Sequence, residues 1–435
     1  MTETFVQEFE ARAGTATADG PEWLEPIRRS AMERFARTGF PGARDEEWRF
    51  TPIGPIAQGS WRPATGGAGG LHREQLAPFL FGHPDWTTLV YVNGVHHEAL
   101  SSVGPLPAGV RVAGLAETLR SDGALLERHL TRHAPADGSP FTAVNTAFLR
   151  DGGVVHIGAG VDLEMPVHLL YVTTADAAGT VAHPRNLIVV DRGARASIIE
   201  SYVTVAPGQN YWTNPVTEVA VAAGAWVEHT RIQRESEGAF HIGLTHVDQE
   251  RDSHYRSFAF DMGAALARHN LHVRLNDENI ESLMYGLYLT RGDQVADNHT
   301  AIYHDRPNCR SWEVYKGILD GRSRAVFNGK VFVKPEAQKT DAKQTNRNLL
   351  LSEGARVDTK PQLEIFADDV KCTHGATVGR LDDLARFYAR SRGLPAAAAE
   401  RLLTYAFAAE VVDEVALLPV REELDRLVFE RLGTL

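Results

Sequence analysis

The stretch ESLMYGLYLTRGDQV, residues 281–295, carries the pattern that decides the fold. From Leu283 to Leu289 every second residue is large and apolar, and alternate positions of a β-strand share one face. Gly292-Asp293 follows at once, and such a pair is typical of a tight turn. The stretch therefore predicts a strand that ends in a turn.

The same combination recurs through residues 151–379, where apolar spacing typical of helices nearly vanishes. Short apolar or alternating runs such as VHLLYV, NLIVV and AVFNGKVFVK are separated by turn signals that begin with glycine. Such self-similarity is typical of a solenoid whose units bury their faces only by stacking, and strand-rich units make that solenoid a β-helix. A β-sandwich with long loops fits the spacing equally well. The turn glycines are 29 to 39 residues apart: Gly158, Gly193, Gly224, Gly263, Gly292, Gly321 and Gly354.

The regions before residue 151 are mixed. Residues 1–85 include an amphipathic helical pattern from Leu24 to Phe35, followed by a glycine- and proline-rich loop. Residues 86–150 combine strand and helix signals, and Asn93-Gly94 between two strand-like runs predicts a type I′ hairpin. We expect an N-terminal helical region and then a mixed α/β segment that leads into the solenoid.

Helical spacing returns in residues 380–435. An apolar stripe runs from Leu381 to Tyr388, and Pro395 and Pro419 introduce two further helices. One interpretation is a cap over the open end of the solenoid, which such folds need. The other is a docking surface for a second protein. Spacing alone favours the cap.

Composition restricts the partners. The formal net charge of -11 and the absence of a Lys/Arg block argue against nucleic acid. No apolar run approaches the roughly 18 residues of a membrane span, and the N-terminus has no signal-peptide pattern, so we expect no membrane contact and a cytoplasmic protein. The two cysteines, Cys309 and Cys372, are expected to be free thiols.

No sequence signature of an enzyme is found. The chain has no phosphate-binding P-loop, no G-x-S-x-G elbow and no H-E-x-x-H motif. Carboxylate pairs occur at Asp277-Glu278 and Asp368-Asp369, so a β-helix enzyme that cleaves acidic polysaccharides stays open as an alternative. We expect a protein without catalytic residues.

Cys372 and His374 are the candidate metal ligands. If residues 369–373 form a strand that continues, Val370, Cys372 and His374 share a face, and the apolar Val370 indicates that this face is covered. Thiolate and imidazole suit iron or iron–sulfur chemistry, but two ligands do not complete a site. The remaining ligands would come from another chain or from small thiols. From spacing alone, a buried structural pair is favoured.

Two blocks of the sequence resemble a known family. Residues 315–393, which include DDVKCTHGATVGRLDD, and the N-terminal stretch RDEEWRFTPI are similar to the SufB/SufD family of iron–sulfur cluster assembly proteins, in particular to its SufD branch. The SufB branch reads His-Glu-Ala-Thr where this chain has His374-Gly375-Ala376-Thr377. SufB also has an acceptor cysteine shortly before this block, and the corresponding stretch here, QTNRNLLLS, has none. The SufB paralogue is thus the less favoured alternative.

The resemblance implies a right-handed parallel β-helix flanked by helical regions, in a non-catalytic scaffold subunit. It implies a heterodimer with SufB through the C-terminal end of the β-helix and docking of the SufC ATPase on residues 380–435. It also places Cys372 and His374 at a nascent iron–sulfur cluster or iron site shared with SufB. Whether the chain forms a homodimer when SufB is absent stays open, and a flavin site is neither predicted nor excluded.

Overall fold

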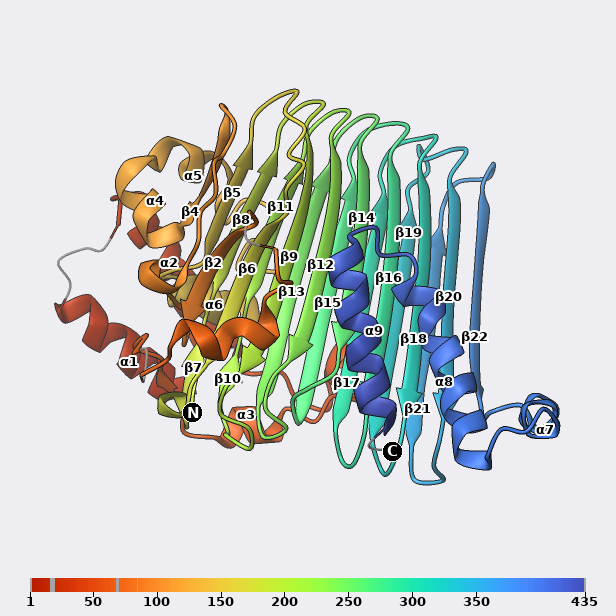
Figure 1. Ribbon diagram of the computed structural model, residues 1–435. Helices are drawn as coiled ribbons and strands as arrows, with labels where there is room; N and C mark the ends of the chain where they lie inside the picture. The colour runs from red at the N-terminus through yellow and green to blue at the C-terminus, as the bar shows by residue number, and fades with distance from the viewer. Residues whose placement is uncertain (1, 16–19, 68–69, 84, 434–435) are drawn as a thin grey trace.

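The computed structural model describes residues 2–15, 20–67, 70–83 and 85–433. In this part of the chain, strands form two sheets, and almost all of the pairings are parallel (Figure 1). Each coil gives one strand to each sheet, so strands of alternating number stack in one sheet. The protein is mainly β, and its core is a parallel β-solenoid; the β-sandwich alternative is wrong.

The first sheet has 12 strands and the second has 10. The first contains, along its main path, β21 (Arg356–Ile365), β19 (Arg324–Val333), β17 (Val295–His304), β15 (Leu266–Leu275), β13 (Phe240–Gln249), β11 (Val216–Val221), β8 (Arg185–Val190), β5 (Gly153–Ile157) and β4 (Val110–Gly114), with β1 (Arg62–Pro63), β7 (Thr180–Ala182) and β10 (Trp212–Thr213) beside it. The second contains, in order, β22 (Lys371–Gly379), β20 (Asp341–Leu350), β18 (Arg310–Leu319), β16 (Glu281–Thr290), β14 (His254–Asp261), β12 (Trp226–Arg234), β9 (Arg195–Thr204), β6 (Val167–Thr173), β2 (Thr87–Val92) and β3 (Val95–His96).

The coil length explains the spacing of the turn glycines. Leu266, Val295 and Arg324 stack in register, so two consecutive coils are each 29 residues long. Gly292 and Gly321 turn between sheets at the same height, with φ of 58° and 70°. A Cβ atom on Gly321 would lie 2.9 Å from the backbone nitrogen of Gly292, so this stacked turn requires glycine as well as favouring it.

The apolar residues that occupy every second position of β16, from Leu283 to Leu289, face outward. Leu287 and Leu289 pack with the C-terminal helices, whereas Met284 and Tyr288 lie in the central core between the two sheets. Gly286 faces inward too, because a Cβ atom there would lie 2.2 Å from the ring of Tyr315. The strand is apolar on both faces because helices cover the outer one.

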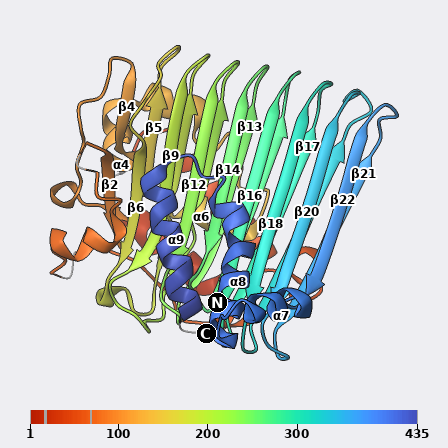
Figure 2. The ribbon, with the colours of Figure 1, turned by 45° about the vertical axis from the view of Figure 1, so that its right-hand side comes forward.

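The C-terminal region forms α7 (Asp383–Ser391), α8 (Ala396–Val412) and α9 (Leu418–Gly433). Figure 2 shows α8 and α9 lying across the outer face of the 10-stranded sheet. Val411 and Leu424 are fully buried there against Phe260 and Leu287. The expectation that these helices cap the end of the solenoid is wrong, since they cover its side.

Most of the N-terminal region covers the opposite side, whereas residues 71–79 pack on the outer face of the 10-stranded sheet. This region contains helices α1 to α6 and short 3-10 turns, and several of its helices pack on the outer face of the 12-stranded sheet. The Asn93-Gly94 hairpin is confirmed, with φ of 49° and 83° between antiparallel β2 and β3. The bounds are α1 (Thr2–Thr15), α2 (Leu24–Thr38), η1 (Glu46–Trp48), α3 (Gly54–Gln58), η2 (Arg73–Phe79), η3 (Glu98–Leu100), α4 (Leu115–Ser121), α5 (Gly123–His129) and α6 (Pro140–Ala147). A further 3-10 turn, η4 (Ala175–Ala177), lies within the solenoid between β6 and β7.

Candidate functional site

The C-terminal end of the solenoid is uncovered. The last strand, β22, pairs with β20 on one side and with no strand of the described residues on the other. Eight of its nine residues are exposed. Its free edge therefore presents unpaired backbone N–H and C=O groups, which form a template for pairing with a strand of another chain.

Cys372 and His374 lie on this edge strand. Cys372 stacks on Ala342 and His374 on Gln344, and both partner positions face the core. Val370 and Cys372 are half-buried against the core, whereas His374 is exposed. The expected common face is confirmed, but it is not covered at His374, because no further coil stacks on it. A buried structural role is thus wrong for His374.

Burial raises the pKa of both cysteine thiols. Burial raises the pKa of the Cys309 thiol to about 11, and its Sγ donates to the carbonyl oxygen of Asp277 at 3.2 Å. Burial also raises the pKa of the Cys372 thiol, and a hydrogen bond from the backbone of Ala342 offsets this only in part. Both thiols are therefore protonated at neutral pH, and Cys372 would lose its proton on binding a metal.

A buried polar pair lies beneath His374. Gln344 is 2% exposed, and its Nε2 donates to Oε2 of Glu313 at 2.7 Å. Glu313 is the residue below Gln344 in the next coil, and burial raises the pKa of its carboxyl group to about 7. His374, Gln344 and Glu313 thus form an inward-facing column of three consecutive coils.

Sequence reasoning did not single out Gln344 and Glu313. Their only signal is the coil length, because 31 residues separate Glu313 from Gln344 and 30 separate Gln344 from His374. That spacing becomes informative once the strand register is known.

Cys372 and His374 alone would not complete a metal site. Among the described residues, no three His, Cys, Asp or Glu side chains are grouped so that they could hold a metal ion. Cys372 and His374 project from one strand beside an open edge, and ligands on an approaching chain could reach them. This agrees with the ligand count from sequence.

An unpaired apolar surface lies on α7. Leu384, Phe387 and Tyr388 are 77%, 72% and 61% exposed, and Leu402 of α8 is 51% exposed. Exposed apolar residues that cluster in this way are typical of protein–protein contact surfaces. We call Leu384, Phe387 and Tyr388 the α7 patch.

The carboxylate pairs do not form an acid–base site. Asp277 and Glu278 both pair with Arg251, at 2.9 and 3.2 Å, on the exposed surface of a turn. Asp369 of the second pair forms an ion pair with Lys339. Three of these four carboxylates are matched by a cation, which does not favour the polysaccharide-cleaving alternative.

The sequence matches two family models that together span most of its length. Residues 171–407 match the SufBD core domain of the SUF system for iron–sulfur cluster assembly, and residues 1–169 match the SufBD N-terminal region. The chain belongs to the SufBD family. Its members take part in iron–sulfur cluster assembly, so the family resemblance found in the sequence is confirmed.

Several SufBD relatives are similar along nearly the whole chain. A SufBD family protein of Synechocystis is 35% identical over 97% of this chain and 94% of its own length. Escherichia coli SufD is 32% identical over 94% and 92%, and Bacillus subtilis SufD is 27% identical over 93% of each. In the part of the chain that the structure describes, no helix is both long enough and apolar enough to cross a membrane.

Proposed function

We propose that this chain is a non-catalytic scaffold subunit of a complex with SufB and the SufC ATPase, and that it works in the cytoplasm. The observation that carries the proposal is the uncovered strand β22, which holds Cys372 and His374 at the open end of the solenoid. A strand of SufB would pair with this edge and bring the missing ligands. SufB and this chain would then share the nascent cluster.

The two candidate ligands would act differently. His374 would bind iron or the nascent cluster as a neutral imidazole, because metal binding requires that form. Its exposure leaves the ring accessible to a partner chain. Cys372 is half-buried and protonated, so it would support the site as a thiol or join it after losing its proton. The cluster here is cargo under assembly rather than a resident cofactor.

The α7 patch supports docking of the ATPase. Its residues are apolar, exposed and close in sequence to β22, which ends at Gly379. A movement imposed on α7 by SufC would therefore reach the SufB interface through only a few residues.

Anaerobic reconstitution with SufB and SufC tests the shared site. His374→Ala should retain both partners and the melting temperature of the native chain but lose iron and sulfide from the complex. His254→Ala is the matched control, because His254 is a partly exposed histidine on the outer face of the same sheet. Unchanged iron in the His374→Ala complex would remove this residue from the site.

Co-purification tests the two surfaces separately. Phe387→Ser should release SufC and retain SufB, whereas Ala376→Pro, which removes a backbone donor from β22, should weaken the SufB interface. If native chain retains neither partner and purifies as a stable homodimer, the scaffold assignment fails.

A further inference from the structure

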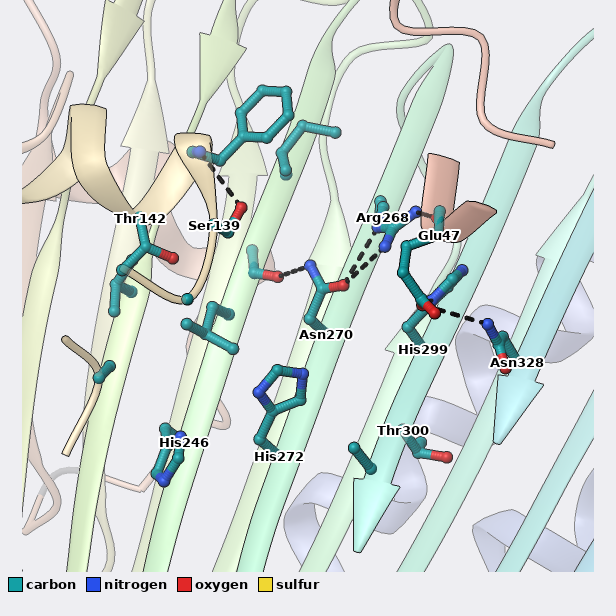
Figure 3. Close-up of a pocket in the computed structure, with 18 of the residues that line it drawn as sticks. Glu47, Ser139, Thr142, His246, Arg268, Asn270, His272, His299, Thr300 and Asn328 are labelled. Carbon is teal, nitrogen blue, oxygen red and sulfur yellow. Dashed lines mark hydrogen bonds and ion pairs between the residues drawn. The ribbon is translucent and has the colours of Figure 1, made fainter. Parts of the chain in front are cut away.

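A separate groove lies on the outer face of the 12-stranded sheet. Its volume is about 420 Å³. The strands β13, β15, β17 and β19 form its floor, η1 forms one wall, and the segment 134–142 before and within α6 forms another (Figure 3). It lies on the side of the solenoid opposite to α8 and α9, and none of its lining residues belongs to β22.

The floor is open because a small residue lies between two long ones. His272, Ala301 and Lys330 occupy the same height on three neighbouring strands. Strands are about 4.8 Å apart, so His272 and Lys330 flank a gap about 10 Å wide over the methyl group of Ala301. The register thus places a recess at the centre of a four-strand surface.

One wall is apolar and rigid. The rings of Trp48 and Phe141 stack at 4.8 Å with an interplanar angle of 29°, and the guanidinium of Arg268 lies 3.7 Å from the ring centre of Trp48. Ile242 and Leu244 continue this wall on β13. Because Arg268 also bonds to Asp297, Asn270 and the backbone of Glu47, the wall is fixed before any ligand arrives.

The rest of the lining is rich in hydrogen-bond donors. Among the described residues that line the groove, Glu47 is the only carboxylate, and it already accepts from His299 at 3.2 Å and Asn328 at 3.3 Å. The imidazole of His272 has no hydrogen-bond partner within the described residues and faces the ring of His246 at 6.1 Å.

Two cations extend the donor-rich side. Lys330 lies 2.7 Å from Glu364, and Arg274 lies 3.3 Å from Asp305. Lys330, Glu364 and Arg274 are partly exposed, whereas Asp305 is buried and also pairs with Lys334 at 3.0 Å. Lys330 can therefore turn toward an acceptor in the groove while Glu364 is solvated, and Asp305 keeps its pairing with Lys334 when Arg274 turns.

We propose that this groove binds a small organic anion whose flat apolar part packs against Leu244 and the edge of the Trp48 ring, and whose carboxylate or phosphate accepts hydrogen bonds from His272 and its cationic neighbours. The groove has nearly three times the volume of an apolar cavity of about 150 Å³ that holds one benzene. It therefore has room for a bicyclic ring with an anionic group. The proposal is independent of the scaffold function.

Isothermal titration of the full chain with 1-naphthoate, 1-naphthyl phosphate and the neutral 1-naphthalenemethanol tests this proposal. We expect saturable one-to-one binding of at least one anion, and at least tenfold weaker binding of the neutral probe. No saturable anion binding, or equal affinity for the neutral probe, would overturn it.

Two variants locate the bound anion. Ala301→Leu fills the recess, and His272→Phe keeps a ring but removes the donor; each should weaken anion binding about tenfold or more. Phe387→Ser is the control, because an apolar probe bound on the α7 patch would be lost with it. Unchanged affinity in both groove variants, with melting temperatures equal to that of the native chain, refutes the site, as does loss of binding in the control alone.

Discussion

The buried carboxyl of Glu313 should make stability depend on pH. Its pKa is raised from 4.5 to about 7 by burial, so the folded chain keeps the proton over a range in which the unfolded chain has lost it. The unfolded state then binds fewer protons, and the free energy of unfolding falls as pH rises from about 4.5 to about 7. Above pH 7 the folded chain carries nearly the full loss of unfolding free energy that comes from ionising this buried carboxyl group.

The magnitude follows from the difference between the two pKa values. For a folded pKa of about 7 and an unfolded pKa of 4.5, the penalty is about 0.8 kcal/mol at pH 5 and about 3.3 kcal/mol at pH 8. The variant Glu313→Gln cannot ionise, yet its amide oxygen can still accept from Gln344. The free energy of unfolding of this variant, measured relative to that of the native chain, should therefore rise by about 2.5 kcal/mol between pH 5 and pH 8.

Differential scanning calorimetry of both chains at pH 5 and pH 8 measures this gain. An unfolding entropy of about 0.9 kcal/mol per kelvin for 435 residues converts 2.5 kcal/mol into a melting-temperature shift of about 3 °C. A solenoid that unfolds in smaller units would shift by more, because each unit has a smaller entropy. Equal differences between the two chains at pH 5 and pH 8 would refute the buried, protonated carboxyl.

Three further predictions concern packing and thiol chemistry. Leu424→Ala should cost about 2–5 kcal/mol of unfolding free energy in a denaturant titration, since this fully buried side chain joins α9 to the sheet, and a cost under about 1 kcal/mol would contradict that packing. Gly286→Ala should cost about 1–3 kcal/mol through its clash with Tyr315, whereas Gly375→Ala, which meets open space, should be neutral; equal costs would contradict the inward orientation of Gly286. At pH 7.5 iodoacetamide should modify Cys372 more slowly than free cysteine and Cys309 only after unfolding, and rapid labelling of Cys309 in the native chain would contradict its burial.

The solenoid could be predicted because each coil contains turn and strand signals that are recognisable in the local sequence and that recur at the coil length. Gly292 and Gly321 mark two turns 29 residues apart, and alternating apolar residues mark the strand between them. The direction of that alternation was not predictable. In β16 both faces are buried, and apolar residues at Leu287 and Leu289 indicate burial without saying whether helices or the core cover them.

The position of the C-terminal helices depends on tertiary packing. Their apolar stripes predict burial on one side, but a cap and a side cover require the same stripe. The deciding contacts, such as Val411 and Leu424 against Phe260, join residues far apart in the sequence. The exposed stripe on α7 has the same spacing as a buried one, so sequence could not separate it from core.

The candidate site was predictable only in part. Ligand type and a spacing of two residues single out Cys372 and His374, but only the family resemblance favours them as ligands over a buried structural pair. Their environment depends on what stacks above and below β22, and neither Gln344 nor the missing next coil can be read from the local sequence. Exposure of His374 is a property of the chain's last coil rather than of its neighbours in sequence.

The two ends of the solenoid are unequal. At the N-terminal end the sheets finish with antiparallel strands, the two-residue β3 and the five-residue β4, whereas the other end finishes with the long parallel strands β21 and β22. Stacking that matches these coils can therefore extend the protein in one direction only. When the C-terminal ends of two chains meet, the free strand edges of both chains become paired. No matching edge is then left for a third chain, so the assembly stops at two chains. A rod open at both ends could instead polymerise without limit, so this asymmetry makes end-to-end association self-terminating.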